Sequence, residues 1–298
     1  MTAPGSIPVA SPRTRGTASV TAVLPWLLLV VAFGVLFWRP AMLLGRDWWN
    51  DPESGHGLLL APVSLWLAWK SGLLPGRSAA PVLGAVLLVA AVLLRGASDL
   101  AAELFIMRMS MVMALVGLVI FYWGVRQALS WWLPFTLVAL SVPLPELLRS
   151  AIAVPLQFIA SQMGAALLEW RQIPVRLAGN IIDIPGHRLF VAEACSGLRS
   201  LTALLALGVL MGGMWLRYPV SRIALLVLAV PIAIAVNGVR VFLTGFLVYF
   251  VDPALGDGFM HLTEGWLLFL VSFLLTVGVA GLVKWIETAL HSRWRTDA

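Results

Sequence analysis

Long apolar stretches follow one another along most of the chain, and they limit the folds open to it more than any other feature. An α-helix needs about 20 mostly apolar residues to cross a bilayer. Two of the stretches, the second and the fifth, are short or interrupted by proline. We therefore predict an all-α polytopic membrane protein with about eight transmembrane helices. The expected spans are residues 22–38, 55–70, 79–96, 104–124, 128–146, 197–215, 219–238 and 262–284.

The composition excludes a water-soluble fold. Of the 298 residues, 60% are hydrophobic and 11% are charged, whereas a soluble domain has about 45–50% apolar and about 25% charged residues. The net charge is +6, which in a soluble protein would suggest nucleic acid as a partner. Here the basic residues are spread thinly between apolar stretches. We interpret them as topology signals and contacts to lipid head groups, so the bilayer is an expected partner and nucleic acid is not.

The distribution of basic residues favours a cytoplasmic position for both termini, because the short loops on that side then hold more of them. Residues 1–21 are rich in Ser, Thr, Pro and Ala and are expected to form a disordered cytoplasmic tail. Residues 22–286 are expected to form a single membrane-embedded domain, followed by a cytoplasmic tail at 287–298. The first apolar stretch lacks a convincing cleavage site, so we interpret it as an uncleaved span.

One long segment, residues 147–196, does not fit the pattern of spans. Its first half, up to Trp170, predicts a helix that lies at the membrane interface or enters it obliquely. The stretch Arg171–Phe190 is rich in β-branched residues and has turn signals at Gly179-Asn180 and Pro185-Gly186. This pattern predicts a small extracytoplasmic β-hairpin just before the next helix.

The only cysteine, Cys195, follows this predicted hairpin and precedes an expected span. A single cysteine excludes an intrachain disulfide and a zinc site of several cysteines. The N-terminus of a helix and a nearby cation such as Arg199, four residues on, both favour a reactive thiolate. The alternative is a small apolar side chain within a span, but the charged neighbours Glu193 and Arg199 argue against it. Ser196 is a second candidate nucleophile, although a thiol is the better one at neutral pH.

A second candidate stretch is Asn237-Gly238-Val239-Arg240, which lies between two apolar stretches. An arginine is costly in hydrocarbon and is by default a functional candidate there. Arg240 could hold a substrate carboxylate or stabilise the oxyanion of a tetrahedral intermediate. The alternative is an arginine that extends from a helix end to the membrane surface.

The third candidate is His261, at the outer start of the last expected span. It could act as general base toward Cys195 and then as general acid for the leaving amine. Glu264 lies on the same helical face, three residues on, and could orient the ring. His56 and His187 also fall on the outer side and compete for this role. The predicted topology brings positions 195, 240 and 261 to one face, which favours acyl transfer without a metal or other cofactor.

At these residues the chain resembles the exosortase/archaeosortase family of polytopic membrane cysteine enzymes. The similarity extends over most of the chain, from about residue 25 to about residue 285. The cysteine motif is its most specific part, and the arginine and histidine motifs are short. The matching features are Ala194–Arg199, Asn237–Arg240, His261, the loop at Asp51–Gly57 and the proline-rich Val142–Pro145.

The resemblance implies a cysteine-type peptidase or transpeptidase of the bacterial inner membrane, with its active site on the extracytoplasmic side. Its partners would be secreted proteins with a C-terminal sorting signal of the PEP-CTERM kind and a single transmembrane helix. Cleavage would pass through a thioester on Cys195, and the protein would be transferred to an amine or to water. Cys195, Arg240 and His261 match the family's essential positions.

Two other classes of function stay open at this point. Intramembrane charges such as Arg108 and Arg240 could line the pathway of a transporter, although the charges cluster at one face and no internal repeat is visible. A non-catalytic factor for exopolysaccharide export is the other alternative. A serine intramembrane protease, with Ser196 as nucleophile, is a variant of the enzymatic hypothesis.

Overall fold

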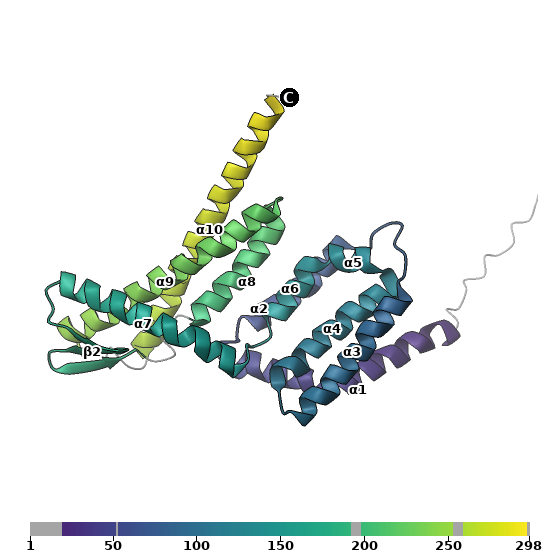
Figure 1. The fold of residues 1–298 in the computed structure, drawn as a ribbon, viewed down its shortest axis with the longest axis horizontal. Helices are drawn as coiled ribbons and strands as arrows, with labels where there is room; N and C mark the ends of the chain where they lie inside the picture. The colour runs from purple at the N-terminus through teal and green to yellow at the C-terminus, as the bar shows by residue number, and fades with distance from the viewer. Residues whose placement is uncertain (1–19, 52, 192–197, 253–258, 297–298) are drawn as a thin grey trace, which may run out of the picture.

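The computed structural model describes residues 20–51, 53–191, 198–252 and 259–296. Within these ranges the chain is mostly helical, as its long apolar stretches predict, and one small sheet interrupts the helices (Figure 1). The elements are α1 Val20–Asn50, α2 Gly57–Ser71, α3 Pro81–Leu100, α4 Leu104–Trp123, α5 Val125–Ser130, α6 Trp132–Leu140, α7 Glu146–Trp170, β1 Arg176–Ala178, β2 Ile181–Ile184, β3 His187–Phe190, α8 Leu198–Trp215, α9 Pro219–Phe250 and α10 Phe259–Thr296.

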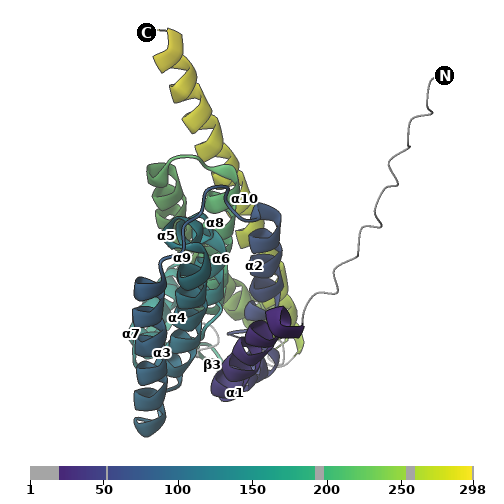
Figure 2. The ribbon, with the colours of Figure 1, turned by 90° about the vertical axis from the view of Figure 1, so that its right-hand side faces the viewer.

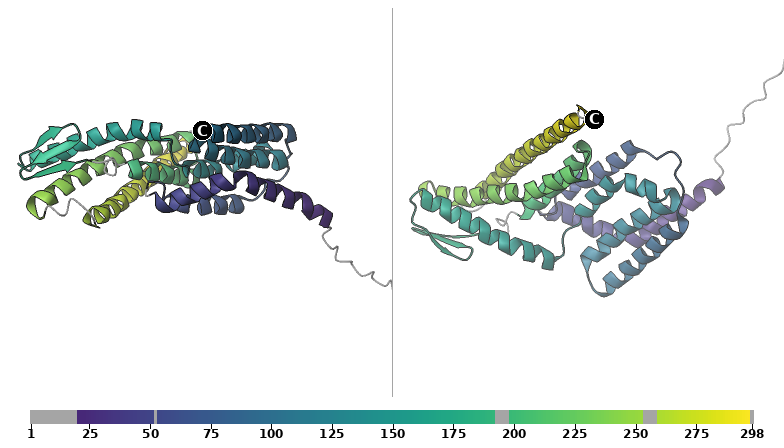
Figure 3. Two further views of the ribbon diagram at one scale, coloured as in Figure 1. Left: turned by 90° about the horizontal axis from the view of Figure 1, so that it is seen from below. Right: turned by 45° about the horizontal axis from the view of Figure 1, so that its top comes forward.

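The axes of helices α2, α3, α4, α6 and α8 are roughly aligned with one another, whereas the axis of α7 lies across them (Figure 1 and the right panel of Figure 3). Helix α7 and the C-terminal part of α9 extend together to the side of this bundle and carry the sheet. Figure 2 shows the last part of α10 extending beyond the other helices.

Six helices are long and apolar enough to cross a membrane, among the residues that the structure describes. The expected count of eight is therefore not confirmed. Helices α2 and α6 have 15 and 9 residues, and α8 is a shorter apolar helix, while α7, expected outside the spans, reaches the required length. The six candidates are Trp26–Asn50, Pro81–Leu100, Leu104–Trp123, Glu146–Trp170, Pro219–Phe250 and Leu267–Leu290.

The sheet has three antiparallel strands in the order β1-β2-β3, one strand more than the expected hairpin. The two predicted turn signals fall between β1 and β2 and between β2 and β3, where Gly179 and Gly186 both have positive φ. Alternate residues of β2, Ile182 and Ile184, are buried. They belong to an apolar cluster with residues of α7 and α9, including Leu168 and Val241. The sheet therefore packs against the C-terminal halves of these two helices.

Buried polar side chains stabilise the loop after α2 and the turn between α8 and α9, at the end of the bundle away from the sheet. The buried Gln127 accepts a hydrogen bond from the backbone N–H of Leu74 at 2.8 Å and donates one to the carbonyl of Gly72 at 3.2 Å. The buried Glu287 of α10 accepts hydrogen bonds from the backbone N–H groups of Arg217 and Tyr218, at 2.9 and 2.8 Å. A carboxylate at this place also complements the dipole of α9, which begins at the next residue.

Candidate active site

Helices α8, α9 and α10 bring three of the sequence-predicted regions to one end of the bundle. Leu225, near the start of α9, shares an apolar cluster with Leu216 just after α8 and with Ala280 of α10. Further along α9, Ala233 packs with Leu201 in the first turn of α8. Helix α9 therefore runs antiparallel to both neighbours, toward the end at which α8 and α10 begin.

Asn237 and Arg240 lie one and two turns beyond Ala233 on α9. Asn237 is buried and Arg240 is half-buried, and the backbone carbonyl of Arg240 accepts a hydrogen bond from Thr244 Oγ1 at 3.0 Å. The sequence indicated an outer boundary of the span near residue 238. The structure instead continues the helix to Phe250, so this stretch lies within α9.

Cys195 and Glu193 fall in residues 192–197, outside the described residues. The chain on both sides of this segment packs against α9. Val191 shares a buried apolar cluster with Val241, and Leu201 shares another with Ala233. The contacts of the two flanks with α9 thus bracket the stretch Asn237–Arg240.

Val191 is fixed further by the turn between β1 and β2. Its backbone N–H donates to the carbonyl of Asn180 at 2.9 Å, and the Asn180 side-chain amide donates to the carbonyl of Val191 at 3.2 Å. The sheet therefore holds the chain in place directly before residues 192–197.

His261 lies in the first turn of α10 and Glu264 follows about one turn later. Their side chains lie outside the described part of the structure, so the expected orientation of the His261 ring by Glu264 stays a prediction. Arg199 is exposed in the first turn of α8, and its carbonyl accepts a hydrogen bond from Thr202 Oγ1 at 3.1 Å. Its proposed effect on the thiol of Cys195 stays a prediction.

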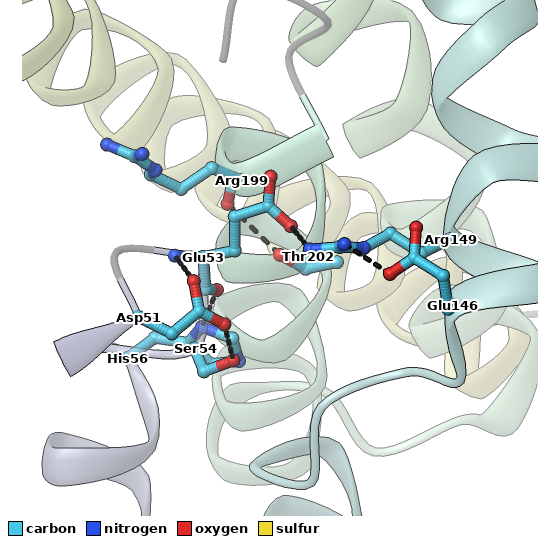
Figure 4. Close-up of polar contacts among 8 residues, drawn as sticks. All are labelled: Asp51, Glu53, Ser54, His56, Glu146, Arg149, Arg199 and Thr202. Atoms are coloured by element: carbon cyan, nitrogen blue, oxygen red, sulfur yellow. Dashed lines mark hydrogen bonds and ion pairs between the residues drawn. The ribbon is translucent and has the colours of Figure 1, made fainter. Parts of the chain in front are cut away.

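The loop between α1 and α2 forms a compact turn at the same end of the bundle (Figure 4). The Asp51 carboxylate accepts hydrogen bonds from the backbone N–H of Glu53 at 3.0 Å and from Ser54 Oγ at 2.7 Å. Gly57 lies against Trp48, where an added Cβ would come within 2.1 Å of the indole Nε1. Only glycine fits at this position, which explains one residue of the Asp51–Gly57 motif.

Both ring nitrogens of His56 face backbone carbonyl groups. Nδ1 is 3.1 Å from the carbonyl oxygen of Glu53, and Nε2 is 3.2 Å from that of Leu140. A neutral imidazole has one N–H donor, so it can donate to only one of these two oxygens. Because both nitrogens are directed at the backbone, this geometry makes His56 a bridge between α6 and the α1–α2 loop. It does not favour His56 as the base for Cys195.

His187, the third histidine considered for this role, is the first residue of β3 and pairs with Ile184 across the sheet. It is half-buried at the turn that joins β2 and β3.

An ion-pair cluster at this end was not predicted from the sequence. Arg149 Nη1 lies 3.1 Å from Glu53 Oε2, and the same guanidinium pairs with the Glu146 carboxylate. The side chains of Glu53 and Arg149 are 19% and 30% exposed, so this pair is better shielded than a surface one. Figure 4 shows the two side chains beside the first turn of α8, which carries Arg199 and Thr202. The sequence signal was weak: a pairing of Glu146 and Arg149 at helical spacing, and an acid in the loop between α1 and α2.

Comparison with known families gives a match over most of the chain. A family model described as a transmembrane exosortase matches residues 48–278 of the chain. The matched region includes the α1–α2 loop, Cys195, Arg240 and His261. No curated protein and no solved structure matches the chain.

Proposed function

Because the chain belongs to the transmembrane exosortase family, we propose that it is a membrane-embedded cysteine transpeptidase that cleaves C-terminal sorting signals of secreted proteins. Its family and the six long apolar helices found among the described residues make it a multi-pass membrane protein. Family membership indicates a membrane sorting transpeptidase in general terms. The cysteine mechanism, the substrate and the side of the membrane are our proposal.

One observation supports this assignment more than any other. Val191 and Leu201, on the two sides of the segment with Cys195, belong to apolar clusters with α9 that bracket Asn237–Arg240. Segments distant in the sequence thus converge where the proposal needs a nucleophile beside a cation. The first turn of α10, which carries His261, begins at the same end of the bundle.

The proposed reaction is acyl transfer. His261 takes the proton from the thiol of Cys195, and the sulfur attacks the scissile carbonyl carbon of the sorting signal. Arg240 stabilises the negative charge on the carbonyl oxygen of the tetrahedral intermediate. The C–N bond then breaks, His261 protonates the leaving amine, and a thioester forms on Cys195. An amine acceptor or water attacks this thioester and regenerates the thiol.

The proposed substrate enters from the bilayer, because a sorting signal next to a single transmembrane helix reaches the enzyme within the membrane plane. We place the reaction at the extracytoplasmic face of the bacterial inner membrane. The reaction as proposed uses only side chains, so no metal or other cofactor takes part in it.

Processing in membranes tests this proposal. A co-expressed reporter with a candidate C-terminal sorting signal would be compared by gel shift in the wild type and in Cys195→Ala, Cys195→Ser and Ser196→Ala variants. We expect processing to be lost in both Cys195 variants and kept in Ser196→Ala, at equal amounts of enzyme in the membrane. Processing by Cys195→Ala would contradict the proposed nucleophile.

A further inference from the structure

The α1–α2 loop presents the carboxylate of Glu53 from a fixed backbone. The backbone N–H of Glu53 donates a hydrogen bond to the Asp51 carboxylate at 3.0 Å, and Nδ1 of His56 lies 3.1 Å from the backbone carbonyl oxygen of Glu53. The same ring reaches the carbonyl of Leu140, the last residue of α6. Polar contacts on both sides of Glu53 therefore restrict where its side chain can extend.

Arg149, the partner of Glu53, lies in the first turn of α7. One and two turns later, Ile152 and Leu156 pack with Leu201 and Leu204 in the first two turns of α8. The ion pair therefore joins the α1–α2 loop to the part of α7 that directly supports the start of α8. Among the described residues, the Glu53–Arg149 ion pair joins the α1–α6 part of the chain to the α7–α10 part, whereas each of the other ion pairs lies within one of these parts.

We propose that the Glu53–Arg149 ion pair is a positioning element of the active site. It ties the α1–α2 loop to the first turn of α7, and the next turns of α7 pack against the start of α8. Helix α8 begins at Leu198, three residues after Cys195 in the sequence, so a fixed α7 in turn fixes the start of α8. Neither residue touches the reacting atoms in this account. The inference rests on the proposed function, since it assigns the pair a task in aligning that nucleophile.

The chain contains a single cysteine, so a thiol reagent labels Cys195 alone and no other cysteine has to be removed before the test. Glu53→Gln, Arg149→Gln and the double variant would be compared for reporter processing and for the alkylation rate of Cys195 by a membrane-impermeant maleimide. Since a displacement of about 1 Å can cost about a hundredfold in rate, we expect each single variant to lose roughly ten- to a hundredfold in processing. The alkylation rate is expected to change several-fold in the same variants.

The double variant is expected to lose no more than the worse single variant, because both changes break one contact. Arg149→Lys keeps the charge and is expected to retain more activity than Arg149→Gln. The control is Asp183→Asn, which makes the same carboxylate-to-amide change in the more exposed ion pair with Arg188 within the sheet, 2.7 Å between Arg188 Nε and Asp183 Oδ1. We expect this control to process the reporter like the wild type. All variants would be assayed below their unfolding midpoints, so that loss of folding is excluded.

Two results separate this inference from the proposed function. If Cys195→Ala is inactive while Glu53→Gln and Arg149→Gln process and react like the wild type, the positioning role is wrong and the cysteine mechanism stands. If the losses of the two single variants multiply in the double variant, the two residues act independently and the inference is also wrong. Processing by Cys195→Ala would instead overturn the proposed function itself.

Discussion

Gly238 of α9 lies so close to Met163 of α7 that a Cβ at position 238 would come within 2.8 Å of the Met163 Cβ. A second close approach follows one turn along, where a Cβ at Gly164 of α7 would lie 2.4 Å from Val241 Cγ1. The absence of side chains at the two glycines sets the separation of α7 and α9. Asn237 is the neighbour of Gly238 and Arg240 is two residues on, so the same contact sets the position of the candidate arginine.

Replacing Gly238 by alanine should therefore push α9 away from α7. We expect a loss of about 1–3 kcal/mol in the free energy of unfolding, typical of overpacking, together with reduced processing. The measurement is thermal unfolding of the purified protein in detergent, combined with the reporter assay. Gly281→Ala in α10 is the matched control, because no atom lies within 4 Å of its added Cβ. An equally stable and active Gly238→Ala variant would contradict the packing argument.

The histidines can be distinguished by substitution. His261→Ala should lower processing by roughly 10²–10⁴-fold, the usual contribution of a general acid or base. His56→Ala removes a bridge between the α1–α2 loop and α6, so it should lower the unfolding midpoint while leaving more activity than His261→Ala. His187→Ala, at a half-buried position of the sheet, should keep more activity than His261→Ala. The base would have to be reassigned if His56→Ala were the inactive variant and His261→Ala the active one.

The ion pair between the buried Arg108 of α4 and the half-buried Asp47 of α1 gives a prediction about stability. The Arg108 side chain is 5% exposed, so removal of its partner leaves a shielded charge without compensation. We expect Asp47→Ala to lower the free energy of unfolding by about 1–3 kcal/mol. Replacing both residues, Asp47→Ala with Arg108→Met, should recover part of that loss. A double variant less stable than Asp47→Ala would show that Arg108 stabilises the fold by other contacts.

Gln127 gives a prediction at the opposite end of the bundle. Its fully buried amide closes the turn after α2, so Gln127→Ala should leave the N–H of Leu74 and the carbonyl of Gly72 without this partner. The expected loss is about 1–3 kcal/mol, measured as a lower unfolding midpoint, with processing unchanged below that temperature. Gln162→Ala on the exposed face of α7 is the control and should be neutral within about 0.5 kcal/mol. Equal midpoints for the two variants would contradict the role assigned to Gln127.

The apolar pattern predicted the helices of the first half well where the stretches were uninterrupted, as in Pro81–Leu100 and Leu104–Trp123. It was less successful where glycine and asparagine occur inside a helix. These residues commonly end helices, yet α9 continues through Asn237-Gly238 because α7 packs against the glycine. The turn signals at Gly179 and Gly186 located the sheet, but the third strand was not predicted. A strand of three exposed residues, such as β1, leaves little hydrophobic pattern.

The candidate site shows a similar division. Arg240 and the start of α10 could be assigned to one side of the bundle from the predicted topology, although the structure places Arg240 within α9 rather than in a loop. The Glu53–Arg149 pair could not, since 96 residues separate the two partners and nothing local indicates the contact. The contacts of His56 with two backbone carbonyl groups could not be predicted either, because every residue has a backbone carbonyl and the sequence does not show which one a side chain will contact.

The most direct test of the central claim is the detection of the acyl-enzyme. Wild-type membranes would be incubated with a tagged sorting-signal substrate and quenched in acid, and the enzyme would be digested and examined by mass spectrometry. We predict a substrate fragment attached to the peptide that contains Cys195, released by neutral hydroxylamine as expected for a thioester and absent in Cys195→Ala. Substrate cleavage with no such adduct, or an adduct on another residue that persists in Cys195→Ala, would contradict a cysteine transpeptidase.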